Sequence, residues 1–327
     1  MKASINNQIL AATGAAELVS THHIQTLWSG YGEIFRCQLT GGKHEQIVVK
    51  HVKLPDQSNH PRGWNSDISH QRKLKSYQVE INWYKGLAKQ ADDACKLPRL
   101  IHAWQEEGEM LMIMEDLNAS GFPKRMTSIT LDEIKNCLSW LAKFHAKYMD
   151  QKPEGLWEIG SYWHLDTRPD ELEAMQNMAL KQAAKSIDEK LKSCKYQTII
   201  HGDAKLANFC FSEDGSRVAA VDFQYVGGGC GMKDVAYFLS SCLTNRELEK
   251  FEQELLRYYF NILVIALDKY SKSLNIQEVI DSYEMMYNYA WSDFYRFLDG
   301  WSPGHWKMNG YSKRITEWVV DELSNGQ

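Results

Sequence analysis

The stretch from His201 to Asp222 carries the residue types that transfer of a phosphoryl group requires. Two isoleucines lead into a loop that contains Asp203, Lys205 and Asn208. Such a transfer needs an oriented hydroxyl nucleophile and neutralised phosphate oxygens, and it asks for little covalent chemistry from the protein. Asp203 could accept the hydroxyl proton, Lys205 could reach the transferring group, and Asn208 could bind a magnesium ion. We interpret His201 as an orienting, hydrogen-bonded residue and not as the base.

A predicted hairpin gives this stretch a geometric check. Residues 209–211 and 218–221 are typical of short strands, with a turn at Glu213-Asp214-Gly215. Asn208 precedes the first strand and Asp222 follows the second, so antiparallel pairing should place them side by side. An amide oxygen and a carboxylate there would suit magnesium between phosphates. A lone Asp and Asn in a loop would more often satisfy backbone groups, but the full combination favours a site.

Residues nearer the N-terminus could bind the nucleotide phosphates. Ser29-Gly30-Tyr31-Gly32 lies between predicted strands, where backbone N–H groups can approach phosphate oxygens, although a plain hairpin turn would look the same. Lys50 ends a β-branched run, and Glu80 on a later predicted helix could pair with it. The alternative for both is a surface charge. Lys53 lies an odd number of residues away and would face the opposite side of the strand.

The elements that must position these residues divide the chain into a strand-rich front and a helical back. Strands are predicted as two around a glycine turn in 27–39, one in 46–53, and a hairpin of 99–105 with 110–114. A loop is predicted over 54–75. Helices are predicted over 76–90, from the capping-box spacing of Thr130 and Glu133 onward, and over 170–193, 234–243, 246–272 and 277–298. This pattern predicts an α+β, two-lobed architecture with lobes 1–116 and 117–327, a connector near 114–118, and a ligand cleft between them.

The composition argues against several classes of protein. The 327 residues carry a formal net charge of −5, which gives no general basic field for nucleic acid. No apolar run is long enough to span a bilayer, and the N-terminus lacks the features of a secretory signal, so no membrane association is expected. Seven scattered cysteines without a CxxC pair predict reduced thiols in a cytoplasmic protein.

The sequence resembles the small-molecule phosphotransferases of the protein-kinase-like superfamily, and most closely the ecdysteroid-kinase-like, or CHK-kinase-like, family. The matching stretches follow the family order across about residues 27–243: Val49-Lys50, Glu80-Ile81-Asn82-Trp83-Tyr84, Met114-Glu115-Asp116-Leu117, Leu141-Ala142-Lys143-Phe144-His145-Ala146, His201-Gly202-Asp203, Val221-Asp222-Phe223-Gln224 and Asp234-Val235-Ala236-Tyr237-Phe238-Leu239.

The resemblance implies a bilobal kinase fold, ATP and Mg²⁺ as cosubstrates, and a hydroxylated small molecule as acceptor. It implies that the adenine contacts the connector at Glu115 and Leu117. It also implies that Asp203 is the catalytic base and that Asn208 and Asp222 bind the metal. A choline- or ethanolamine-type kinase and a catalytically silent binding module of the same fold are the alternatives.

The sequence departs from a protein kinase in three places. Phe35 stands where the phosphate loop of a protein kinase has its third glycine, Gly202 stands in place of arginine, and no Ala-Pro-Glu follows Asp222. These departures argue against a protein kinase regulated by phosphorylation.

Four further features have open or structural interpretations. The run 227–231 contains four glycines and is either a flexible connector or a loop that gates the substrate. Asp234 is predicted to cap a helix, and the resemblance implies that an aspartate here also helps to fix the catalytic loop. His145 is predicted to be a hydrogen-bonded core residue. Trp301 and Trp306 flank a loop and could form the wall of an acceptor pocket, facing either a steroid-like ring or a quaternary amine.

Overall fold

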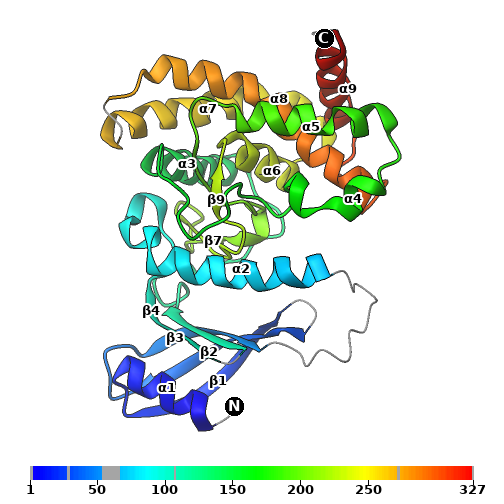
Figure 1. Ribbon diagram of the computed structural model, residues 1–327. Coiled ribbons are helices and arrows are strands. Elements are labelled where there is room, and N and C mark those ends of the chain that lie inside the picture. Colours follow the sequence, from blue (N-terminus) through cyan, green and yellow to red (C-terminus); the bar gives the residue numbers. More distant parts are fainter. Residues whose placement is uncertain (1–2, 28–29, 54–66, 107, 271–272, 326–327) are drawn as a thin grey trace.

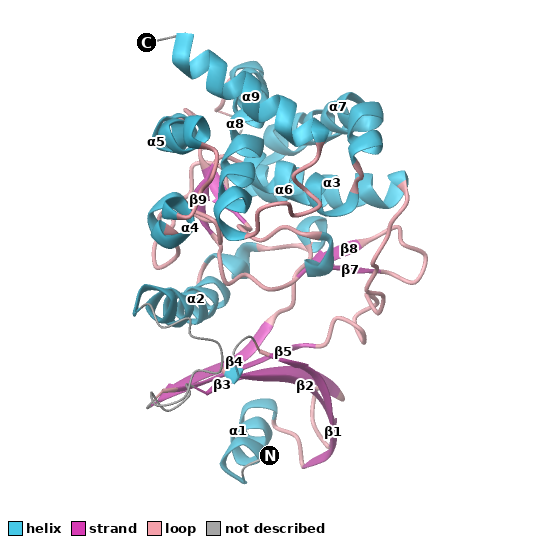
Figure 2. Cartoon of the chain, turned by 90° about the vertical axis from the view of Figure 1, so that its right-hand side faces the viewer, coloured by secondary structure: helices cyan, strands magenta, loops and turns pink. Residues whose placement is uncertain are grey.

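A five-stranded antiparallel sheet forms one end of the molecule (Figures 1 and 2). The computed structural model describes residues 3–27, 30–53, 67–106, 108–270 and 273–325. The strands follow the order β1-β2-β3-β5-β4, with bounds β1 Glu17–Thr26, β2 Gly32–Thr40, β3 Gln46–Lys53, β4 Leu100–Glu106 and β5 Glu109–Glu115.

The two faces of the sheet have different neighbours. Ile47 and Val49 of β3 are fully buried against α1 (Ala3–Thr13), which covers the outer face. Lys50 faces the opposite side, toward the rest of the molecule, as the twofold alternation of a strand requires. Lys53 is exposed and, unlike Lys50, is not among the residues that line the cleft.

The N-terminal elements differ from the sequence prediction. The helix α1 was not predicted, and the first strand ends at Thr26 instead of beginning near Leu27. Nine of the ten residues of β1 are exposed, so the strand has no alternation of apolar and polar residues from which it could be recognised. The predicted hairpin of β4 and β5 is confirmed.

The helix α2 (Asp67–Lys85) lies between the sheet and the helical part (Figure 1). It begins nine residues earlier than Ser76, where the prediction placed its start. Its first turns are polar because their side chains bond to the helical part: Arg72 donates to the Thr167 carbonyl at 2.6 Å and Lys73 to Gln224 at 3.1 Å. A helix with such a face carries little apolar periodicity.

The helical part confirms the predicted helices, with one exception, and adds a helix at the C-terminal end. Its helices are α3 Leu131–Lys147, α4 Pro169–Glu173, α5 Met178–Lys192, α6 Met232–Cys242, α7 Asn245–Tyr270, α8 Ile276–Trp301 and α9 Gly310–Asn325. The exception is the single helix predicted over 170–193, which is two, α4 and α5. The capping box of Thr130 and Glu133 is present at the start of α3. Within the described part of the chain, no helix is both long and apolar enough to cross a membrane.

Two small sheets lie between the helices and α2. The predicted hairpin is confirmed as β7 (Phe209–Phe211) and β8 (Val218–Ala220). The glycine run forms a buried strand, β9 (Gly227–Gly229), paired with β6 (Thr198–Ile200), so it is neither a connector nor a gating loop. A Cβ atom at Gly227 would lie 2.2 Å from the Trp157 carbonyl oxygen, so close backbone packing explains the glycine.

Candidate active site

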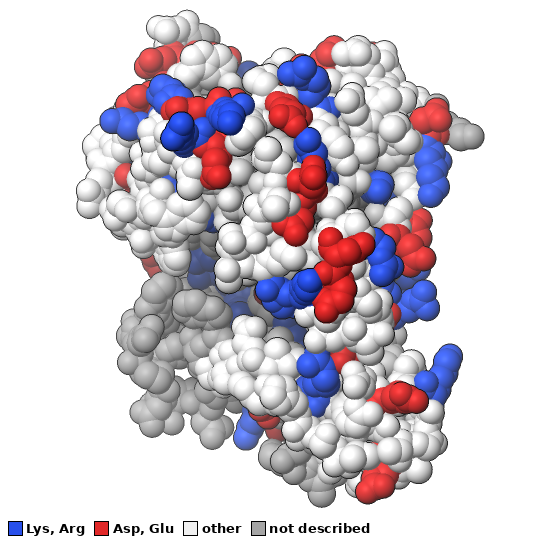
Figure 3. Space-filling model, turned by 180° about the vertical axis from the view of Figure 1, so that it is seen from behind, with Lys and Arg blue, Asp and Glu red and all other residues white. Residues whose placement is uncertain are grey.

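A cleft of about 1480 Å³ lies between the sheet and the helical part. Strands β1 to β3 and helix α2 form one wall, and the loops around β6 to β8 form the other. Figure 3 shows a hollow between the two parts, with Lys and Arg side chains recessed in it. The sequence-predicted residues that line it are Lys50, Glu80, Glu115, Leu117, Asp203, Lys205, Asn208 and Asp222.

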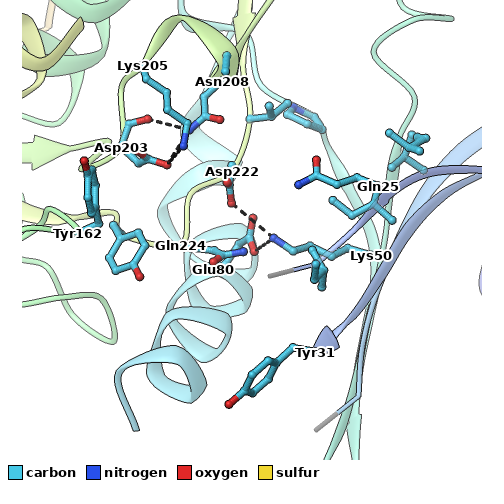
Figure 4. A pocket seen from close by; sticks show the side chains of 18 of the residues that line it. Gln25, Tyr31, Lys50, Glu80, Tyr162, Asp203, Lys205, Asn208, Asp222 and Gln224 are labelled. Carbon is cyan, nitrogen blue, oxygen red and sulfur yellow. Dashed lines mark hydrogen bonds and ion pairs between the residues drawn. The ribbon is translucent and has the colours of Figure 1, made fainter. Parts of the chain in front are cut away.

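Asp203 lies on the floor of the cleft and is 6% exposed. Its Oδ2 atom accepts hydrogen bonds from Lys205 Nζ and from Asn208 Nδ2, both at 3.0 Å (Figure 4). Its Oδ1 atom is buried and has no hydrogen-bond donor among the described residues. Burial raises the pKa of Asp203, although the Lys205 ammonium opposes this shift. The carboxylate therefore has one oxygen held by the loop and one left for a ligand.

A buried network behind the cleft fixes the backbone that carries Asp203. The Asp234 carboxylate accepts from the backbone N–H groups of His201 and Gly202, at 2.6 and 2.9 Å. His145 lies 3.2 Å from the same carboxylate and 2.8 Å from Tyr259, which confirms it as a hydrogen-bonded core histidine. Asp234 is the third residue of α6, and Gly231 holds the cap position, so the predicted capping role is wrong. The carboxylate instead fixes the loop that carries Asp203, as the resemblance implied.

Steric contacts explain why glycine stands at position 202. Gly202 has a φ of +76°, a conformation that side-chain-bearing residues rarely adopt. A Cβ atom there would lie 2.1 Å from the Tyr225 carbonyl oxygen. His201 beside it bonds through its ring to the Val221 carbonyl at 3.0 Å and to the Asp203 N–H at 3.2 Å, which confirms its orienting role.

The hairpin brings Asn208 and Asp222 to the same end, as the sequence predicts. The Val221 N–H donates to the Asn208 carbonyl at 2.9 Å, so Asp222 directly follows the residue opposite Asn208. Asp222 has a φ of +67°, and such backbone strain in a non-glycine residue costs about 1–3 kcal/mol and is concentrated at functional sites. Its buried Oδ1 atom has no hydrogen-bond donor in the described part of the chain.

These oxygens fit a magnesium ion. The Asn208 amide nitrogen donates to Asp203, so its amide oxygen is the atom that remains for a metal. Among the residues that the structure describes, no cluster of three or more His, Cys, Asp or Glu side chains could hold a metal by itself. Magnesium in such sites is typically held by one or two carboxylates together with substrate phosphates. The donor set of Asn208 and Asp222 corresponds to that type.

Lys50 joins the two sides of the cleft electrostatically. Its ammonium lies 2.5 Å from Glu80 Oε2 and 3.6 Å from Asp222 Oδ1 (Figure 4). Burial acts to lower the pKa of Lys50, but the charges of Glu80 and Asp222 outweigh it and raise the pKa above its usual value. The pKa of Asp222 is held below its usual value because nearby lysines, Lys50 first, outweigh the effect of burial. Lys50 and Asp222 are therefore both charged at neutral pH.

Of the other predicted nucleotide-binding residues, some line the cleft and others do not. Glu115 and Leu117 line the cleft where β5 ends, but the Glu115 carboxylate is engaged by Lys96 at 2.8 Å. Its backbone N–H is also engaged, since it donates to the Arg99 carbonyl at 2.9 Å. Gly30 and Gly32 are not among the lining residues, although the neighbouring Tyr31 is. Ser29 lies outside the described residues.

The sequence analysis missed several lining residues on α2 and on the loop before α4. Arg72 and Lys73 come from the part of α2 that was predicted as loop, and Tyr162 and Arg168 lie in a segment without a motif. Burial lowers the pKa of Lys73 to about 8, against the opposing charge of Asp222. The lysine and arginine residues in the first turns of α2 could have indicated cleft residues, but only if the helix had been predicted to begin at Asp67.

Of the two tryptophans proposed for the acceptor wall, one lines the cleft. Trp301 ends α8, faces the cleft, and stacks on Phe297 with ring centroids 5.5 Å apart. Trp306 is 58% exposed and is not among the lining residues. The earlier aromatic residues of α8, such as Tyr287 and Trp291, are buried in the core as predicted.

The sequence matches the model of the ecdysteroid kinase-like family over residues 32–156 and 148–272. No curated protein matches the sequence significantly. Among solved structures, a microcompartment-associated aminopropanol kinase superposes with a TM-score of 0.53 at 15% identity, covering 99% of this chain and 98% of that chain. This likeness shows the kinase-like fold.

Two other solved structures are similar at lower TM-scores. An aminoglycoside phosphotransferase from Streptomyces rimosus, solved with ADP and streptomycin, gives 0.49 at 13% identity over 87% of this chain and 97% of that chain. An ethanolamine kinase from Plasmodium vivax gives 0.48 at 13% identity over 92% and 82%.

Proposed function

The chain belongs to the ecdysteroid kinase-like family of small-molecule kinases, and we propose that it transfers the γ-phosphoryl group of ATP to a hydroxyl group of a small molecule. One observation carries the proposal. Asp203 presents a buried carboxylate oxygen without a hydrogen-bond donor in the described structure, and the buried Oδ1 atom of Asp222 has no hydrogen-bond donor but lies 3.6 Å from the Lys50 ammonium in the same cleft. Buried polar atoms are normally satisfied, so such oxygens indicate a missing ligand.

The residues of the floor take the following roles in this proposal. Asp203 accepts the proton of the acceptor hydroxyl, since it is held by Asn208 and Lys205 and keeps one oxygen free. Lys205 neutralises the phosphoryl group as it passes. Asn208 and Asp222 would hold magnesium, which when bound neutralises the phosphate oxygens.

The nucleotide occupies the end of the cleft nearer the sheet. Lys50, oriented by Glu80, binds the phosphates, and the adenine lies against the segment containing Glu115 and Leu117. Residues 1–116 act as the nucleotide-binding lobe and 117–327 as the catalytic and substrate lobe. The backbone at Gly30 and Gly32, on either side of the lining residue Tyr31, covers the phosphates in the same proposal.

The proposal also places the protein in the cytoplasm. Cys37, Cys95, Cys137, Cys194, Cys210 and Cys230 are buried free thiols and Cys242 is half-buried. Free thiols of this kind are typical of a reducing compartment that also supplies ATP.

Thermal unfolding with nucleotide tests the proposal. A ligand present at 100 times its Kd stabilises the folded state by about 2.7 kcal/mol. We expect millimolar Mg-ATP to raise the Tm of the wild type, and we expect Asp222→Asn to lose most of the magnesium-dependent part of that shift. A folded wild-type sample whose Tm does not respond to Mg-ATP would favour a catalytically silent binding module.

A further inference from the structure

The end of the cleft beyond Asp203 is lined by aromatic rings and by cations. The rings that line it are Tyr162, Tyr225, Tyr237, Phe297 and Trp301. They pack on one another at centroid distances between 5.4 and 5.9 Å, for example Tyr162 against Phe297 at 5.4 Å and against Tyr225 at 5.9 Å. This wall suits a ligand with a flat ring system.

Cations of the protein itself already lie over several of these rings. The Arg168 guanidinium lies over Tyr162 and Phe297, at 5.7 and 5.2 Å from the ring centroids. The Lys307 ammonium lies over Tyr237 at 4.6 Å. A cage for a quaternary or protonated amine would need these faces for the ligand, but here they attract the protein's own charges.

The acidic side chains of the cleft are also occupied. Each described carboxylate that lines it lies within ion-pairing distance of a protein cation: Glu80 and Asp222 near Lys50, Glu115 near Lys96, Asp116 near Arg36, and Asp203 near Lys205. An ammonium group on a substrate would therefore meet a protein cation beside every described carboxylate of the cleft.

The charge of Arg72, unlike the charges of these carboxylates, is not balanced by a described ion-pair partner. Its guanidinium donates to the Thr167 carbonyl at 2.6 Å and to the Ser69 hydroxyl at 2.9 Å, both neutral groups. No described carboxylate forms an ion pair with it. Arg168 nearby has a single carboxylate partner, Glu171 at 2.9 Å. Burial lowers the pKa of Arg72 and the positive charge of Arg168 lowers it further, while Tyr225 and the charge of Glu171 oppose this shift without outweighing it. Two cations with one carboxylate between them leave an unbalanced positive charge at this end of the cleft.

We propose that the acceptor is a ring-bearing alcohol that also carries an acidic group, a carboxylate, sulfate or phosphate, bound by Arg72 with Arg168. The aromatic wall holds the ring, and the acidic group balances the arginine charge. Arginine presents a planar fork of donors that suits such an anion. Amino alcohols and aminoglycosides are disfavoured at the same place. This inference rests on the proposed phosphotransferase function and specifies the substrate class of that same site.

A charge-matched set of probes tests the inference. Cholic acid, its methyl ester and the corresponding 24-amine share one hydroxylated steroid, and 4-(hydroxymethyl)benzoic acid, 1,4-benzenedimethanol and 4-(aminomethyl)benzyl alcohol share one hydroxymethyl ring. Calorimetric titration into the full chain saturated with Mg-ADP measures binding without requiring turnover. We expect at least one acid to bind about 10- to 100-fold more tightly than its neutral partner, the ratio given by hydrogen bonds to a charged group. We expect the amines to bind more weakly still.

Variants assign the preference to Arg72. Arg72→Gln is expected to remove the preference for the acid, Arg72→Lys to retain part of it, and Arg72→Glu to reverse it toward the amine. Arg314→Gln removes an arginine from an exposed ion pair with Glu249, so it is the matched control and should leave the preference unchanged. Since the Lys and Gln variants differ by one charge, a folding defect in either one alone does not remove the test.

The outcomes separate this inference from the function on which it rests. Equal binding of the three charge forms, preference for the amine, or no binding by either acid overturns the inference. Arg72→Gln weakening Mg-ADP binding as strongly as acid binding also overturns it, because Arg72 would then be a nucleotide ligand. Failure of the wild type to bind Mg-ADP, titrated by itself before the probes are added, counts against the phosphotransferase function itself.

Discussion

The buried pair of Lys50 and Glu80 gives a prediction whose size can be worked out from the structure. Both side chains are almost completely buried, at 3% and 2% exposure, and their charged atoms lie 2.5 Å apart. Removing one partner of a buried pair usually costs about 3–5 kcal/mol because the other charge is left unpaired. In Glu80→Gln, however, Lys50 still has Asp222 at 3.6 Å.

The attraction between Lys50 and Asp222 should therefore offset part of the free energy of unfolding that is lost in Glu80→Gln. At an effective dielectric constant of about 20, a pair of charges 3.6 Å apart retains about 70% of the attraction present at 2.5 Å. Because 39% of the Asp222 side chain is exposed, solvent screening reduces this further. We expect Glu80→Gln to lower the free energy of unfolding by about 2–3 kcal/mol. Mg-ATP affinity should also fall, since Lys50 is drawn toward Asp222.

A double-mutant cycle with Lys50→Met measures the coupling. Urea denaturation of the wild type, both single variants and the double variant gives four unfolding free energies, and the double variant should be less destabilised than the sum of the singles. Asn82→Gln on the same helix, whose side chain bonds to the Gly155 carbonyl, is the control for a change outside the pair. Additive effects of the two substitutions, or a loss below about 0.5 kcal/mol in Glu80→Gln, would refute the reasoning.

Two further predictions follow from other buried charges. Asp293 is fully buried between Lys233 at 3.1 Å and Arg296 at 2.7 Å, so Asp293→Ala should cost about 3–5 kcal/mol by urea denaturation, and a loss under 1 kcal/mol would contradict this. The pH profile of kcat/KM reports ionisations of the free enzyme. Activity should fall at low pH as Asp203, whose pKa burial raises, becomes protonated. It should also fall at high pH as Lys73, which lines the cleft and interacts with the charge of Asp222, loses its own charge near pH 8. Lys73→Arg should move the alkaline limb to higher pH, and an unmoved limb would show that another group titrates there.

The sequence predicted the parts of the fold that carry local signals. The capping box predicted the start of α3. The turn at Glu213-Asp214-Gly215 predicted the hairpin that brings Asn208 and Asp222 together. These features depend on residues that are neighbours in the sequence. Regular spacing therefore sufficed to predict them.

The elements that were missed depend on contacts between distant segments. The run Gly227–Gly229 looked flexible because glycine is permissive, but Trp157 and Ile200 pack against its backbone and make it a strand. The start of α2 looked like a loop because it is polar, and several of its polar residues, such as Arg72 and Lys73, line the cleft. Asp234 looked like a cap from its local sequence, and only the resemblance indicated that its carboxylate fixes the loop that carries Asp203.

Transfer of labelled phosphate from ATP by the wild type and by Asp203→Asn tests the central claim most directly. With γ-labelled ATP, magnesium and a pool of hydroxylated small molecules, including the acids described above, the wild type should form a labelled organic phosphate monoester. Asp203→Asn should form it about 100- to 10,000-fold more slowly while binding Mg-ATP as tightly as the wild type. Equal rates in the two proteins, or label released only as inorganic phosphate at the same rate from both, would contradict the account.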